Sequence, residues 1–102
     1  MRATKRRPVP PGEILTEEFL RPLGLTQGQL AEAMGVPRKQ VNEICNGRRG
    51  ITVATALLLE RVLGTSSEFW LNAQRRSDIW EAMHSRSMQK KLERVKPVKV
   101  AA

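Results

Sequence analysis

A helix–glycine–helix pattern at residues 25–47, LTQGQLAEAMGVPRKQVNEICNG, most limits how this chain can fold. Thr26 with a glutamine three residues later fits a capping box at the start of one helix, and Gly35 is a typical helix stop. Pro37 suits the first position of a second helix, and the Asn-Gly pair near its far end is typical of a left-handed stop. Two short helices joined by three or four residues that include glycine predict a helix-turn-helix.

The second of these helices should have one buried and one exposed face. Val41 and Ile44 are spaced to anchor it to the core, so Arg38, Lys39 and Asn42 share the solvent side. Cations in the first turn oppose the helix dipole, at a cost of about 0.3–1 kcal/mol. This cost is smaller than the binding free energy that these side chains would gain from a suitable partner.

Duplex DNA is such a partner, because the second helix of a helix-turn-helix enters the major groove. Arg38 and Lys39 can donate to guanine O6 and N7, and Asn42 can pair with adenine N6 and N7. Each good pair gives roughly 1–3 kcal/mol of discrimination. These residues are therefore the predicted base readers. Phosphate contacts are predicted for Gln27, at the start of the first motif helix, and for the two arginines at 48–49.

The rest of the chain predicts further helices and no strand. A first helix should run from the Pro-Pro-Gly at 10–12 to Gly24, and a fourth should span 53–63 after a Thr52 cap. Thr65, with a glutamate three residues on, fits a second capping box that opens a fifth helix. The expected fold is therefore an all-α, five-helix domain.

Three parts of the chain are expected from composition. Residues 1–11 read as a basic, flexible arm, residues 12–84 as the domain with a C-terminal dimerisation helix, and residues 85–102 as a basic tail, partly helical or disordered. The formal net charge is +8, and the two tails hold all of the excess, because the rest of the chain is nearly neutral. Those tails could bind a polyanion or merely be solvated. The central cluster of Arg38, Lys39 and the two arginines at 48–49 favours the polyanion.

The composition disfavours catalysis and metal binding. The chain has one cysteine, one histidine and no tyrosine, and it lacks a glycine-rich phosphate loop. A single cysteine and a single histidine are too few for a cysteine/histidine metal site, and they give little basis for a catalytic nucleophile–base pair. We expect no enzyme activity, no cofactor and no bound metal. No apolar run is long enough for a membrane span and no secretory signal is recognisable, so a reduced, cytoplasmic protein is expected.

The stretch LTQGQLAEAMGVPRKQVNEICNGRRGIT…ALLLERVLGTSSEFWLNAQ resembles the Xre/Cro-type, or lambda-repressor-like, helix-turn-helix proteins. The leading PPGEIL…EFLRPLGLTQ and the later LGTSSEFWLNAQ are similar to the HigA family of type II toxin–antitoxin antitoxins. The resemblance implies a DNA-binding antitoxin that neutralises a HigB-type, mRNA-cleaving toxin and represses its own operon as a dimer on palindromic DNA. The remaining alternative is a stand-alone Xre-type regulator without a toxin, and a small, basic toxin-like gene beside this one would distinguish the two.

The family's site residues can be carried over by position. The resemblance implies base reading by Arg38, Lys39 and Asn42. It implies phosphate contacts at the entry to the first motif helix and in the loop after the second, and the predicted set is Thr26, Gln27, Gln40, Arg48 and Arg49.

Two protein-contact surfaces are also expected. The fifth helix carries an apolar stripe that either closes the core of one chain or, in part, forms a homodimer interface, with the candidate residues Phe69, Trp70, Ala73, Ile79, Trp80 and Met83. The two tails are candidates for toxin binding by composition, because such segments can fold on a partner. Both are basic, however, and a basic toxin would favour an acidic surface, which Glu13, Glu17 and Glu18 of the first helix offer. No membrane and no small-molecule substrate is expected as a partner.

Overall fold

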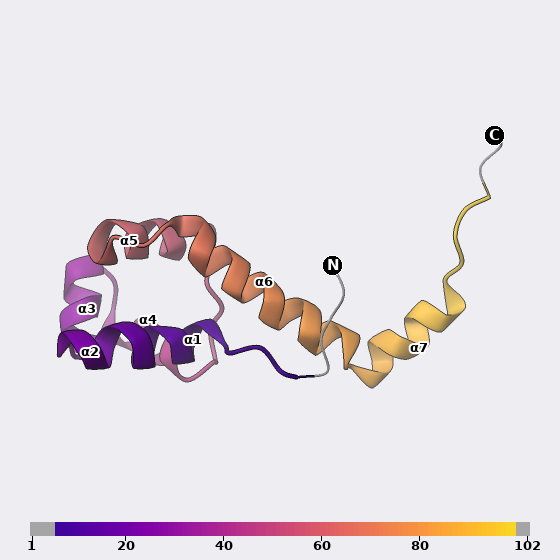
Figure 1. Ribbon diagram of the computed structural model, residues 1–102, viewed down its shortest axis with the longest axis horizontal. Helices are drawn as coiled ribbons and strands as arrows, with labels where there is room; N and C mark the ends of the chain where they lie inside the picture. The colour runs from indigo at the N-terminus through magenta and orange to yellow at the C-terminus, as the bar shows by residue number, and fades with distance from the viewer. Residues whose placement is uncertain (1–5, 100–102) are drawn as a thin grey trace.

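The computed structural model describes residues 6–99, and all regular structure in that range is helical (Figure 1). A continuous helical run comes first, made of α1 (Pro11–Ile14), the π-helical segment η1 (Leu15–Leu20) and α2 (Arg21–Leu23). The later helices are α3 (Gln27–Met34), α4 (Arg38–Cys45), α5 (Val53–Leu63), α6 (Ser67–Met83) and α7 (Arg86–Arg94). The predicted all-α fold is confirmed, and residues 1–5 and 100–102 of the predicted tails lie outside the described range.

The π-helical segment ends two residues before a proline. The Arg21 N–H donates to the Thr16 carbonyl, five residues back, which gives a wider turn than an α-helix. Pro22 has no N–H to donate, and its ring crowds the carbonyl that a regular turn would place beside it. The wider turn lets the run continue to Leu23 and then end at Gly24.

The core gathers the inward faces of the helices around Trp70. This indole is fully buried, and its Nε1 donates to the Thr65 hydroxyl at 2.6 Å. Phe19 and Phe69 contact its ring, with centroids 5.4 and 5.0 Å away. The fully buried aliphatic side chains around it include Leu15, Leu30, Val41, Ile44 and Leu59. Burial of several such side chains, at roughly 1.5–3 kcal/mol each, fixes α4 against the domain.

A close helix contact places the start of α1 against the end of α4. A Cβ atom at the buried Gly12 would lie only 2.0 Å from the Ile44 carbonyl oxygen. Glycine therefore lets the two backbones touch, which no other residue could do without a shift. The contact holds α4 from behind while its opposite face remains open.

The cap of α6 differs from the prediction. Ser66, and not Thr65, is the N-cap, because its Oγ accepts from the Phe69 N–H at 3.1 Å. The Thr65 hydroxyl is engaged by the Trp70 indole instead. The predicted left-handed Asn-Gly stop of α4 is half right, since Gly47 has a φ of 73° while Asn46 has a φ of −92°.

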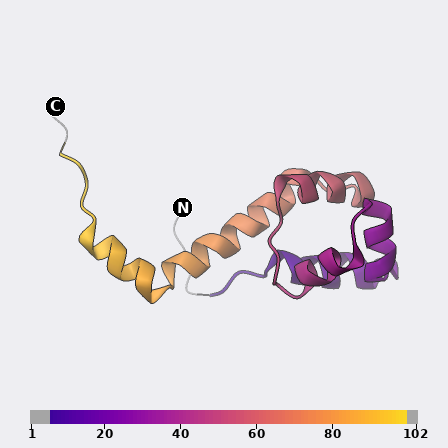
Figure 2. The same cartoon turned by 180° about the vertical axis from the view of Figure 1, so that it is seen from behind.

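Two helices extend beyond the rounded body (Figures 1 and 2). The far half of α6 leaves the body, and α7 turns away from it after His84, which gives principal extents of 55 × 28 × 21 Å. The expectation of five helices therefore misses one, because α7 is a separate helix capped by Ser85 and not an extension of α6. The divisions at residues 11/12 and 84/85 stay predictions.

Candidate nucleic-acid interface

The second motif helix, α4, presents its predicted reading residues to solvent. Val41 and Ile44 are buried to 0% and 2% exposure, which fixes the rotation of the helix. Arg38, Lys39 and Asn42 are all exposed on the other side. The structure therefore brings these side chains onto one open face, as the helical spacing predicts.

A chain of side-chain amides orients Asn42. Its Nδ2 donates to Gln27 Oε1 at 3.0 Å, and its Oδ1 accepts from Asn46 Nδ2 at 3.2 Å. An amide has two N–H donors and an oxygen with two lone pairs. One donor and one acceptor of Asn42 therefore stay available side by side, and that is the pair an adenine edge requires.

The entry to α3 adjoins this face. The Arg38 side chain lies in ordinary contact range of Gly28, since a Cβ there would be 3.8 Å from Arg38 Cδ. Thr26 and Gln29 form the predicted capping box, with bonds of 3.0 and 2.9 Å between each side chain and the other's N–H. The cap satisfies the Gln29 N–H, while the N–H groups of Gln27 and Gly28 have no intrahelical partner and point out of the helix end. Reading residues and free N–H groups thus form one continuous surface.

The two arginines after α4 are in different states. Arg49 donates from Nε and one terminal nitrogen to Glu43 Oε1, at 3.1 and 2.9 Å. These hydrogen bonds hold the pKa of the Glu43 carboxyl below its usual value, with weaker help from the charges of Arg49, Lys39 and Arg48. Arg48 is exposed and has no ion pair within residues 6–99. Arg48 is therefore the more available cation, a difference that the sequence pattern did not reveal.

Gln40 and Gln27, the other predicted phosphate contacts, are both half-buried. Gln27 is used in the amide chain with Asn42, so its remaining amide hydrogens are what it can offer a phosphate.

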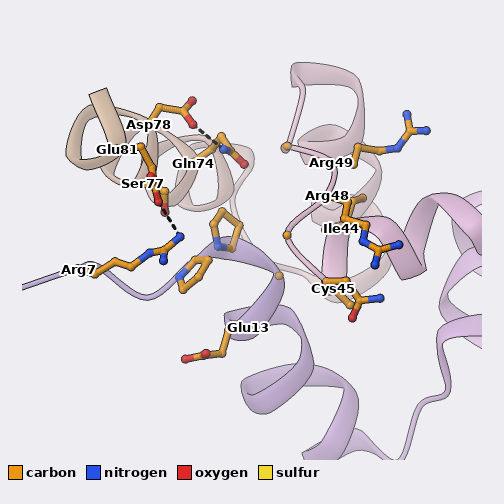
Figure 3. A pocket seen from close by; sticks show the side chains of 16 residues that line it. Arg7, Glu13, Ile44, Cys45, Arg48, Arg49, Gln74, Ser77, Asp78 and Glu81 are labelled. Atoms are coloured by element: carbon orange, nitrogen blue, oxygen red, sulfur yellow. Dashed lines mark hydrogen bonds and ion pairs between the residues drawn. The ribbon is translucent and has the colours of Figure 1, made fainter. Parts of the chain in front are cut away.

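A solvent-open cavity of 640 Å³ lies beside the interface, between α6 and the loop after α4 (Figure 3). Arg48 and Arg49 border one side, and Gln74, Asp78 and Glu81 of α6 border the other. Arg7 reaches across from the N-terminal arm to Glu81 at 2.6 Å. Sequence reasoning did not single out these α6 residues, although Gln74 and Asp78 stand at helical i, i+4 spacing.

Comparison with known proteins identifies the family. Residues 17–70 match the helix-turn-helix family. The chain is 46% identical over 101 residues to antitoxin HigA-1 of Vibrio cholerae, covering 99% of this chain and 93% of that protein. The chain belongs to the HigA family of helix-turn-helix proteins.

Solved structures of HigA proteins agree with this assignment. A HigA-family addiction module antidote protein from Coxiella burnetii is 42% identical with a TM-score of 0.81, over 91% of this chain and all of that one. The Pseudomonas aeruginosa antitoxin HigA, solved with the higBA promoter, is 34% identical with a TM-score of 0.82, over the same shares. The predicted resemblance and fold class are confirmed, and relatives named as antitoxins agree with the expectation of a non-enzyme.

The dimer residues predicted from the apolar stripe of the fifth helix fall into two groups. Trp70 and Ala73 are fully buried in the core of one chain, so they offer no surface to a second copy. α6 packs against α1 and α5, and the Trp70 ring meets Phe19 of η1. Phe69 and Met83 are exposed to 38% and 46%, and Ile79 and Trp80 are half-buried.

Trp80 already has neighbours within the chain. Its ring stacks on His84 at a centroid distance of 4.0 Å, and the Arg7 guanidinium carbon lies 5.7 Å from its centroid. His84 donates from Nδ1 to the Trp80 carbonyl at 2.8 Å, so it caps the end of α6. These contacts tie the arm to α6 and leave only part of the indole for another partner.

The acidic residues predicted to meet a toxin are all exposed on the first helical run. Glu17 forms an i, i+4 ion pair with Arg21 at 3.3 Å. Glu13 also borders the cavity. Glu13 and Glu18 have no ion pair in the part of the chain that the structure describes.

Neither a metal site nor a membrane span is found among residues 6–99. No group of at least three histidine, cysteine or acidic side chains there could hold an ion. None of the helices in that range has both the length and the apolar character for crossing a bilayer.

Proposed function

We propose that this HigA-family protein is a DNA-binding antitoxin of a type II toxin–antitoxin module, which represses its own operon. The observation that carries the proposal is the open face of α4, where Arg38, Lys39 and the oriented amide of Asn42 lie together. The Pseudomonas aeruginosa relative solved with a promoter supports it, because the two folds superpose over most of both chains.

The work is divided between base edges and phosphates. Arg38 and Lys39 donate to guanine O6 and N7, and Asn42 uses its remaining donor and acceptor on adenine. Thr26, Gln27 and Gln40 sit at the rim of this face, where side chains and free N–H groups can hold phosphate oxygens. Arg48 adds a cation that carries no sequence information, and Arg49 can do so after leaving Glu43.

A homodimer is part of the proposal. Two copies related by a two-fold axis would read a palindromic operator with half-sites about 34 Å apart or a multiple of that. After removal of the buried residues, the candidate surface consists of Phe69, Ile79, Trp80 and Met83. Leu92 on α7 is a further exposed apolar side chain beyond Met83 in the sequence.

The toxin partner is proposed to be a HigB-type, mRNA-cleaving protein that works in the cytoplasm. Glu13 and Glu18 offer exposed carboxylates without ion pairs among residues 6–99, so they can meet a basic surface. Replacing Glu13, Glu17 and Glu18 by glutamine should weaken binding of the toxin encoded beside this gene, measured by calorimetry, while operator binding persists. Unchanged toxin binding would move the contact to another surface. Absence of any toxin gene would leave the stand-alone regulator.

The deciding experiment is fluorescence anisotropy with a duplex from the region upstream of this gene. The wild type and the double variant Arg38→Ala/Asn42→Ala are titrated with that duplex and with a scrambled one, at several salt concentrations. We expect tight binding to the upstream duplex by the wild type, and the double variant should keep only the weak binding to either duplex.

A matched control uses the same two residue types elsewhere. Asn72 and Arg75 are exposed on α6, so Asn72→Ala/Arg75→Ala should leave the preference for the upstream duplex intact. Equal, salt-sensitive binding of all three proteins to both duplexes would assign the binding to the basic tails and overturn the proposal.

A further inference from the structure

The loop from α4 to α5 is attached to the domain at two points. At its start, the N–H groups of Arg48 and Arg49 donate to the Glu43 carbonyl at 2.8 and 3.2 Å. Near its end, the Ile51 N–H donates to the side-chain Oε1 of Gln74 on α6 at 2.8 Å. The second attachment crosses 23 positions of sequence and is the one that relates the loop to α6.

The Gln74 amide has only one orientation that serves this loop. Its Nε2 donates to Asp78 Oδ1 at 2.9 Å, so its oxygen faces Ile51. A flipped amide would set N–H against N–H at Ile51 and oxygen against oxygen at Asp78. Asp78 thereby fixes the direction in which Gln74 accepts.

The contact is tight and the donor it satisfies is buried. Ile51 is 5% exposed, and a buried N–H that loses its acceptor carries a substantial free-energy penalty. A Cβ at Gly50 would lie 3.3 Å from the Gln74 side chain, so the loop backbone runs directly along this amide. Without the Gln74 amide, the Ile51 N–H must donate to a water instead, or the loop must move until another acceptor is reached.

We propose that Gln74 is a positioning residue for DNA binding, which holds the loop so that Arg48 and Arg49 reach phosphates on the duplex. The inference rests on the proposed DNA binding by α4. Gln74 itself touches no DNA, and Asp78 acts one step further back by orienting the Gln74 amide. Base reading by Arg38 and Asn42 should be independent of this support, because those residues are fixed by the core and by Gln27.

The test is the salt dependence of binding by Gln74→Leu, which keeps the side-chain size and removes both hydrogen bonds. We expect weaker binding to the upstream and the scrambled duplex by the same factor. The slope of log affinity against log salt should fall by about one, the value for one lost phosphate contact. The affinity loss should then be about threefold larger at about 50 mM than at about 200 mM salt.

Two variants test the mechanism against a general loss of structure. Asp78→Asn keeps an acceptor for Gln74 Nε2, so its salt slope should stay that of the wild type. Asn72→Leu makes a similar polar-to-apolar change on an exposed position of α6 and should also leave the slope unchanged. A double-mutant cycle adds Arg48→Ala, which should lower the slope less in the Gln74→Leu background than in the wild type.

A direct readout does not need DNA. Amide hydrogen exchange at Ile51, followed by NMR, should speed up in Gln74→Leu while exchange at the buried Val41 of α4 stays slow. Faster Ile51 exchange with an unchanged salt slope would overturn the inference. If the wild type itself shows no preference for the upstream duplex, the proposed function fails instead, so the two failures are distinguishable.

Discussion

The helix pair α3–α4 and the helix pair α6–α7 are built in opposite ways. Leu30 and Val41 are fully buried beneath the first pair, and the bond between Gln27 and Asn42 joins its outer faces. α7 has no buried residue, and Leu92 on it is 50% exposed. A nine-residue helix is marginal on its own in water. The first pair is therefore held by contacts within one chain, whereas α7 makes few contacts with the rest of the domain.

The largest expected difference between the regions is in stability. Trp70→Ala should lower the free energy of unfolding by about 3–5 kcal/mol, because it leaves a cavity in the core and the Thr65 hydroxyl without its indole. Leu92→Ala in α7 should change the same quantity by no more than about 0.5 kcal/mol in the monomer. Urea denaturation of the two variants measures both. Equal losses would mean that α7 belongs to the folding unit of the body.

A second difference separates base reading from phosphate binding within the first region. Arg38→Ala should cost about 1–3 kcal/mol on the upstream duplex and little on a scrambled one. Arg48→Ala should weaken both duplexes alike and reduce the salt slope by about one. Arg49→Ala should act in the same way but less strongly, because Glu43 competes for that guanidinium. Anisotropy titrations across salt concentrations separate these outcomes, and a sequence-dependent loss in Arg48→Ala would contradict the division.

The pair of Glu43 and Arg49 predicts a smaller, pH-dependent effect. Because the pKa of Glu43 is lowered in the folded chain, its contribution is complete above the ordinary value of 4.5 and is lost as pH falls through the lowered folded value. The wild type should therefore lose a little more melting temperature than Glu43→Gln when the pH drops from neutral to below 4.5. The same variant frees Arg49 and should strengthen binding to both duplexes. A weaker affinity would show that the ion pair places Arg49 usefully.

The smallest expected effect on the folded monomer concerns the apolar end of the molecule. Leu92→Glu should leave the circular dichroism melt almost unchanged, since this side chain is half exposed. It should lower self-association in sedimentation velocity if α6 and α7 face a second copy, and Trp80→Ala should do the same. Glu93→Gln, at an exposed position of the same helix, serves as the control. An unchanged oligomer in both apolar variants would remove this end from the proposed dimer.

Much of the fold could be predicted because its signals are local. The capping box at Thr26 and the limits of the helix at 53–63 were predicted from neighbouring residues and are confirmed. The exposure of Arg38 and Asn42 followed from the helical period. The cap of α6 was misplaced by one residue, because Thr65 is recruited by a ring five positions away and Ser66 takes its role.

Sequence alone determined the helices of the body, the helix-turn-helix and the outward face of α4, since each depends on residues within about one or two turns of each other, whereas the separate helix α7 was not predicted. Tertiary structure decided which side of α6 the core takes, which is why Trp70 and Ala73 are core residues and not interface residues. It also decided the bonds from Gln27 to Asn42 and from Ile51 to Gln74, which join positions 15 and 23 residues apart. Such contacts depend on how whole helices cross, and a local pattern of side chains does not contain that angle.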